Sequence, residues 1–173
     1  MLRLFDSFSK EKIDFSPINP NNVRLYVCGP TVYDLIHVGN ARPLIVFDVL
    51  YRLLRYTYPR VTYVRNITDI DDKIMARAKQ QGIDIQTLTS KTTDDFHRDV
   101  AALGTLSPDF EPKATEYVEG MIAMIQGLVE QGFAYVADGH VLFRVKSYPA
   151  YGSLSKLPQQ ELEDGARVEV ATY

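Results

Sequence analysis

The sequence lacks the disulfide-forming cysteines of many extracellular proteins and the long apolar runs of membrane proteins. Its 173 residues include a single cysteine, Cys28, and no tryptophan. One cysteine cannot form a disulfide within the chain, which predicts an intracellular, cytoplasmic protein. No apolar run approaches the roughly 18 residues that a membrane-spanning helix needs. The polar start, MLRLFDSFSK, is unlike a secretory signal. We therefore expect no association with membranes.

The chain also lacks a strong excess of charge of either sign. Its formal net charge is −3, with 24% charged and 46% hydrophobic residues. These fractions are ordinary for a globular domain and argue against disorder, collagen and coiled coil. A net charge so close to zero predicts no broad basic surface for nucleic acid, although a local basic patch is compatible with it.

The first half of the chain carries a strand–helix–strand pattern. Residues 23–27 and 61–67 are rich in β-branched and aromatic residues and predict two strands. Residues 41–56 place apolar side chains at helical spacing, with Pro43 expected in the first turn. Two strands joined in this way run parallel, with a right-handed crossover. The predicted fold class is therefore α/β with a parallel sheet.

The second half is mainly helical and then forms a hairpin. Each of three predicted helices is followed by a glycine, the residue that most readily adopts the left-handed conformation at a helix end. The helices are expected at 71–81, at 86–103 and from the cap Thr115 up to Gly132. Residues 108–112 are expected to be a linker, and 166–170 resemble a strand. Two further strands, 133–136 and 141–145, flank the turn signal Asp138-Gly139.

The segment from Cys28 to Asn40 is the most informative part of the chain. It follows the first strand and leads into a helix, which is where ligands bind in open α/β sheets. A helix N-terminus offers free N–H groups and a partial charge of about +0.5, both suited to phosphate. His37 and Asn40 would straddle this opening, and Gly39 would let a flat ring or a phosphate come close. These residues predict a nucleotide site, but a plain loop in which His37 caps the helix is an equal alternative.

Longer motifs favour one family. His37-Val38-Gly39-Asn40 resembles the first signature of class I aminoacyl-tRNA synthetases, usually His-Ile-Gly-His. The surrounding sequence is more specific and resembles the cysteinyl-tRNA synthetase family. The matching segments are 26–34 (YVCGPTVYD), 41–43, 63–74 (YVRNITDIDDKI), 112–115, 132–135 and 165–168. The resemblance implies the first half of a Rossmann-like catalytic domain over residues 1–82. A helical segment and the start of a connective insertion would follow over residues 83–173.

The resemblance also implies an activity and a set of site residues. Such enzymes activate cysteine with ATP and Mg²⁺ as cysteinyl-adenylate, then transfer it to tRNA(Cys). Cys28 would be one of four zinc ligands, which select the substrate thiol. The cysteine pocket would contain Gly29, Thr31 and Thr68. The ATP site would contain His37, Gly39 and Asn40, with His37 and Asn40 acting in catalysis. Asn40 stands where the signature has a second histidine, so it can donate a hydrogen bond but cannot carry a proton's charge.

Members of this family are longer than this chain. They supply three further zinc ligands and a Lys-Met-Ser-Lys-Ser loop from later segments, and this sequence contains neither a second cysteine nor such a loop. We therefore expect an N-terminal fragment that is inactive alone and does not bind zinc stably. The family is usually monomeric, but half a sheet exposes an edge and apolar helix faces, so the isolated chain is expected to self-associate.

Two other functions and one other site are compatible with parts of the sequence. The chain could be a shortened paralogue that binds nucleotide or tRNA without aminoacylation. It could also belong to a related ligase, of the mycothiol type, that joins cysteine to an amino sugar. The acidic run Asp69-Ile70-Asp71-Asp72 could suggest magnesium, but aspartates at a helix start are better explained as caps.

Overall fold

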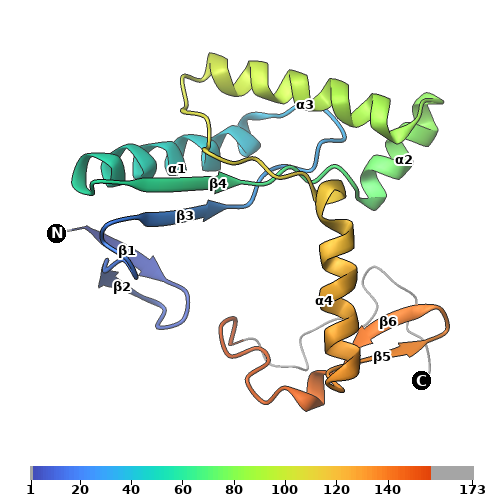
Figure 1. Cartoon of the computed structure of the whole chain (residues 1–173). Coiled ribbons are helices and arrows are strands. Elements are labelled where there is room, and N and C mark those ends of the chain that lie inside the picture. Colours follow the sequence, from blue (N-terminus) through green and yellow to red (C-terminus); the bar gives the residue numbers. More distant parts are fainter. Residues whose placement is uncertain (1, 157–173) are drawn as a thin grey trace. The chain divides into compact units, whose positions relative to one another are not determined.

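The computed structural model describes residues 2–156, which belong to two compact units (Figure 1). One unit is Pro17–Val118, and the other combines Met1–Ser16 with Glu119–Tyr173. No helix in the described part of the chain is both long and apolar enough to cross a bilayer.

The unit Pro17–Val118 is built around two parallel strands. β3 (Val23–Val27) pairs with β4 (Val61–Arg65), with Val23 opposite Val61 and Val27 opposite Arg65. Helix α1 (Val38–Thr57) connects them. This arrangement confirms the α/β prediction with parallel strands, and it brings the carboxyl ends of both strands to the same edge.

Helix α1 begins three residues earlier than the sequence predicts. His37 is its N-cap, and its Nδ1 accepts a hydrogen bond from the Gly39 N–H at 3.0 Å. Asn40 completes the cap because its Oδ1 accepts from the His37 N–H at 3.1 Å. Pro43 therefore lies in the second turn, where its missing N–H leaves the Gly39 carbonyl without its usual helical donor.

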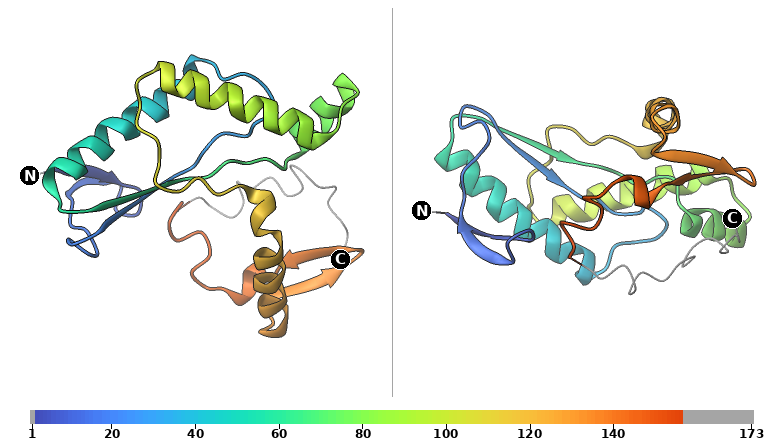
Figure 2. Two further views of the ribbon diagram at one scale, coloured as in Figure 1. Left: turned by 45° about the horizontal axis from the view of Figure 1, so that its top comes forward. Right: turned by 90° about the horizontal axis from the view of Figure 1, so that it is seen from below.

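The free edge of β4 is covered by the segment expected to be a linker. Residues 109–114 run beside it, as Figures 1 and 2 show in yellow. The Arg65 N–H donates to the Phe110 carbonyl at 3.1 Å, and the Ile67 N–H donates to the Pro112 carbonyl at 2.9 Å. The segment connects two helices without forming a regular element of its own, as predicted, but its pairing with β4 was not predicted. Prolines suit such an edge position, because their carbonyls can pair and their missing N–H is not needed.

Two further helices pack within this unit. α2 (Asp72–Gln81) ends at Gly82, and α3 (Ile85–Ala102) is followed by Gly104, both glycines having positive φ as predicted. Between α3 and the end of the unit lies the short helix η1 (Ala114–Tyr117).

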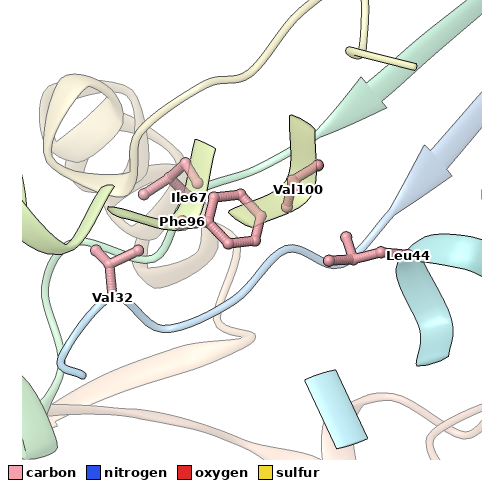
Figure 3. Close-up of a cluster of buried hydrophobic side chains, with 5 residues drawn as sticks. All are labelled: Val32, Leu44, Ile67, Phe96 and Val100. Carbon is pink, nitrogen blue, oxygen red and sulfur yellow. The ribbon is translucent and has the colours of Figure 1, made fainter. Parts of the chain in front are cut away.

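The core explains why α3 belongs with the strand pair. It joins side chains from the loops after β3 and β4, from α1 and from α3 (Figure 3). Its members are Val32, Leu44, Ile67, Phe96 and Val100. The compact unit therefore runs across residue 82, the boundary that the sequence suggested.

The described residues of the other unit form two hairpins, a longer helix and a short one. β5 (Ala134–Ala137) and β6 (His140–Phe143) pair antiparallel around Asp138 and Gly139, both at positive φ, which confirms that hairpin. Helix α4 (Val118–Glu130) precedes it, and the short helix η2 (Val145–Ser147) follows. The strand-like residues 166–170 lie outside the described residues.

The sequence did not predict the first hairpin. β1 (Arg3–Asp6) pairs antiparallel with β2 (Glu11–Asp14). The Asp6 carboxylate accepts from the Phe8 and Ser9 N–H groups in the turn, and these bonds lower the pKa of Asp6. Short, largely exposed strands leave little hydrophobic pattern, which is why this hairpin was missed.

Candidate active site

The chain continues side by side beyond the ends of β3 and β4. The Thr68 N–H donates to the Pro30 carbonyl at 3.0 Å, and the Val32 N–H donates to the Thr68 carbonyl at 3.1 Å. Thr31 and Thr68 are thereby paired across an isolated parallel bridge. The two threonines predicted for one pocket are neighbours, each half-buried.

Asn66 joins these two segments through its side-chain amide. Its Oδ1 accepts from the Gly29 N–H at 2.9 Å, and its Nδ2 donates to the Thr68 Oγ1 at 3.1 Å. The backbones are so close here that a Cβ at position 29 would lie 1.6 Å from the Asn66 carbonyl oxygen. Glycine is therefore the only residue that fits at position 29.

The capping contacts at the start of α1 decide which donors remain for a ligand. His37 Nδ1 accepts from a backbone N–H, so the neutral ring carries its proton on Nε2. Asn40 Oδ1 likewise accepts from a backbone N–H, which leaves its NH₂ group to donate. Both side chains are exposed. An oxygen-rich anion such as a phosphate would suit this pair of donors beside a helix N-terminus.

One small cavity is lined by residues from the end of β3 and from the start of α1. Its volume is about 130 Å³, and its lining includes Cys28 and Gly29 from the end of β3 with Gly39 and Asn40 from α1. Pockets for drug-sized ligands measure roughly 300–1,000 Å³, so this cavity suits a group the size of an amino acid rather than a whole nucleotide. His37, Thr31 and Thr68 do not line it, although hydrogen bonds tie His37 to Gly39 and tie Thr68 to Asn66.

The described residues do not make a zinc site. The Cys28 thiol is exposed, but residues 2–156 hold no cluster of three His, Cys, Asp or Glu side chains able to bind a metal. His97 is paired with the Glu111 carboxylate. Since structural zinc takes four ligands, Cys28 can supply one thiolate and the described part of the chain does not complete the set.

The acidic run after β4 is used for capping. Both oxygens of the buried Asp69 accept hydrogen bonds from Thr115, one from its N–H at 3.0 Å and one from its hydroxyl at 2.5 Å. Asp71 caps α2 by accepting from the Lys73 N–H at 2.9 Å. A larger cavity of about 540 Å³ lies beside Asp69 and Thr115, and its lining contains none of the predicted site residues.

Three residues near the site were not singled out from the sequence. Phe96 of α3 lines the small cavity, and the guanidinium carbon of the buried Arg65 lies 5.1 Å from its ring centre. Arg65 is held by Glu111, whose Oε1 accepts from its Nη2 at 2.7 Å. Asn66 could have been found as an amide two positions before Thr68. No local signal marks Phe96, which reaches the cavity only through the packing of α3.

Comparison with known proteins gives a consistent result. Residues 14–173 match the family described as "tRNA synthetases class I (C) catalytic domain". Two similar curated proteins, both named cysteine–tRNA ligase, come from Rhodospirillum centenum and Gluconobacter oxydans. They are 59% and 56% identical over 99% and 100% of this chain. The chain spans 38% of the length of each.

A solved structure supports the fold. LeuRS of Agrobacterium radiobacter, in a ternary complex with tRNA and LeuAMS, superposes with a TM-score of 0.59. The match covers 70% of this chain and 16% of that one, at 21% identity. At this identity the likeness concerns the fold alone.

Proposed function

Since this chain belongs to the family of class I (C) tRNA synthetase catalytic domains, we propose that it carries part of the active site of a cysteine–tRNA ligase. In the proposed reaction, the carboxylate of cysteine attacks the α-phosphate of ATP, which is bound with Mg²⁺. Pyrophosphate leaves and cysteinyl-adenylate forms. A ribose hydroxyl of the terminal adenosine of tRNA(Cys) then takes the cysteinyl group and releases AMP. The names of the two curated relatives support tRNA over an amino sugar as the acceptor.

The nucleotide side of the site is assigned to the start of α1. The Nε2–H of His37 and the NH₂ of Asn40 donate to phosphate oxygens as negative charge builds, while Gly39 leaves room for the nucleotide. Catalysis of this kind depends on positioning and on charge stabilisation. Loss of one such donor costs about 10²- to 10³-fold in rate. Asn40 can serve in place of histidine because the role needs only a hydrogen-bond donor. Its Oδ1 is engaged in the cap, so its NH₂ group is the part that faces a ligand.

The cysteine side is assigned to Cys28, Gly29, Thr31 and Thr68. The observation that carries the proposal is the cavity of about 130 Å³ shared by Cys28 and Gly29 with Gly39 and Asn40. It joins the end of a parallel strand to the opening of the following helix, so an aminoacyl group and its phosphate can meet there. Zinc, where bound, would distinguish a thiol from a hydroxyl, and Cys28 would supply one of its ligands. We also propose a cytoplasmic location, where tRNA is charged.

Binding of a stable cysteinyl-adenylate analogue, 5′-O-(N-cysteinylsulfamoyl)adenosine, tests this proposal. The 173-residue chain should bind it in isothermal titration calorimetry. His37→Ala removes both the cap and the Nε2–H donor, whereas His37→Asp keeps a capping oxygen and, as an ionised carboxylate, has no donor. Both variants should lose affinity by about tenfold or more, while His37→Asp keeps the thermal stability of the wild type. No binding by the wild-type chain would sink the proposal.

A nucleotide-binding or tRNA-binding module without aminoacylation is the remaining alternative. Cysteine-dependent exchange of pyrophosphate into ATP separates binding from chemistry. The 173-residue chain has one thiol ligand and no Lys-Met-Ser-Lys-Ser loop, so we expect exchange near background. Robust exchange would show that these residues suffice for adenylate formation.

A further inference from the structure

We propose that Asn66 is a positioning residue of the cysteine pocket, fixing the Gly29 wall and turning the Thr68 hydroxyl into a donor for the aminoacyl group. This inference rests on the proposed function and deepens it. Asn66 is not itself assigned a contact with substrate. It acts through Gly29 and Thr68, which lie on the two segments that continue β3 and β4.

The orientation of the Asn66 amide follows from its partners. The Gly29 N–H can only donate, so the atom that it meets at 2.9 Å must be Oδ1. The Tyr26 hydroxyl also donates to Oδ1, at 3.2 Å. With the oxygen engaged twice, the NH₂ group is directed to the Thr68 Oγ1 at 3.1 Å. The amide of Asn66 therefore has a single orientation, with Oδ1 toward Gly29 and Nδ2 toward Thr68.

This direction determines what Thr68 can offer to a ligand. Its oxygen accepts from Asn66, and within residues 2–156 its hydroxyl proton is donated to no protein acceptor. A hydroxyl that accepts one hydrogen bond is polarised to donate another. The Thr68 O–H is thus prepared for an acceptor atom such as an oxygen of the aminoacyl group.

The same amide fixes the wall of the cavity. Gly29 lines it next to Cys28, and the position of Gly29 is held from one side by Asn66 Oδ1. The close approach to the Asn66 backbone carbonyl also restricts movement of Gly29 toward the segment after β4. Asn66 thereby couples the position of Gly29 to the orientation of Thr68.

The decisive variant is Asn66→Asp. A carboxylate still accepts from Gly29 and Tyr26, but it cannot donate to Thr68, so the threonine hydroxyl turns to donate to the carboxylate instead. We expect affinity for the sulfamoyl analogue to fall about 10- to 100-fold. Affinity for ATP, which is assigned to the start of α1, should stay within about twofold. General damage to the fold would lower both affinities.

Two further variants isolate the route through Thr68. Thr68→Val should weaken analogue binding to a similar extent, and Asn66→Asp should add little in the Thr68→Val background. Thr68→Ser keeps the hydroxyl and should bind within a few-fold of the wild type. Asn22→Asp is the matched charge control, because the Asn22 amide accepts from the Thr62 hydroxyl at the opposite end of the strand pair. It should leave both affinities unchanged.

These measurements distinguish a failure of the positioning role of Asn66 from a failure of the proposed function. If the wild-type chain binds the analogue and Asn66→Asp lowers the affinities for analogue and ATP equally, the positioning role is overturned and the proposed function stands. Additive effects of Asn66→Asp and Thr68→Val overturn it in the same way. If the wild-type chain does not bind the analogue, the proposed function fails and the positioning role fails with it.

Discussion

At the scale of single residues, steric and hydrogen-bonding constraints converge on the turn after β3. Gly29 meets a backbone carbonyl at a distance that excludes any side chain, and the neighbouring Cys28 is left exposed. His37 and Asn40 each use one polar atom to cap α1 and keep one donor. The cap and the nucleotide site, which the sequence presents as competing explanations of His37, are therefore compatible.

Gly29→Ala should be strongly destabilising. The new methyl group would lie 1.6 Å from the Asn66 carbonyl oxygen, so the two segments must separate. We expect a loss of about 3 kcal/mol in unfolding free energy, at the upper end of overpacking effects. Urea unfolding followed by circular dichroism measures it.

The control is Gly120→Ala, in α4, where a Cβ would meet open space. It should leave stability unchanged or raise it by up to about 1 kcal/mol, since alanine favours helix over glycine. If the two substitutions had equal effects, the close approach at Gly29 would be disproved.

At the scale of elements, the sequence predicts helix ends well where the chemistry is local. Gly82 and Gly104 mark the ends of α2 and α3 to within about a residue, because glycine adopts a positive φ without steric cost wherever it stands. The start of α1 was misplaced because histidine is an uncommon cap and Pro43 suggested a first turn. The pairing of residues 109–114 with β4 could not be predicted, since it depends on the path of α3 and on a sheet edge distant in sequence.

The N-cap of α3 gives a prediction about pH. Asp84 accepts from the Thr87 hydroxyl and N–H, and these bonds hold the pKa of its carboxyl below the usual 3.8. Because the folded state favours the charged form, this cap stabilises fully above the unfolded pKa and is lost as the pH falls through the folded value. The wild type should therefore be more stable than Asp84→Asn at neutral pH. This difference in unfolding free energy should shrink as the pH falls from about 5 to about 2.

Urea unfolding of both proteins across that range provides the measurement. A difference that stays constant down to pH 2 would contradict a charged cap. Thr87→Ala, which removes one of the two bonds to Asp84, should flatten the same pH dependence in part.

At the scale of the whole molecule, much apolar surface is uncovered. The apolar pattern of α1 predicts a wide hydrophobic face, and the structure buries only part of it. Beyond its first turn, the uncovered apolar side chains of α1 are Ile45, Val46, Val49, Leu53 and Tyr56. Soluble monomers seldom leave such a stripe open to water, so self-association of the isolated chain remains our prediction.

Val49→Lys should shift this association toward monomer. Val49 is 62% exposed, so a lysine there adds charge to the stripe without disturbing the core. Gln81→Lys, at the exposed end of α2, adds the same charge away from the stripe. Sedimentation velocity over a range of concentrations should show dissociation for the first variant and not for the second. Equal behaviour of the two variants would mean that this face of α1 is not the contact.

The site could be predicted in outline because parallel strands bring their carboxyl ends together. By that rule the segments that follow β3 and β4 lie side by side, and in the structure Gly39 and Asn40 line the same cavity as Cys28. The roles of these residues stay predictions. Phe96, which lines the cavity, and the Arg65–Glu111 pair beside it could not be predicted, since their positions depend on packing between distant parts of the chain.

In our proposal, the segments that follow β3 and β4 and the start of α1 form one site for an aminoacyl-adenylate. The decisive experiment is a titration of the ¹⁵N-labelled 173-residue chain with the cysteinyl-adenylate analogue, followed by amide NMR. We expect the amide signals of Gly29 and Thr68 and those of Gly39 and Asn40 to shift together, with one dissociation constant. Shifts confined to one of the two segments, or two different constants, would contradict a single shared site.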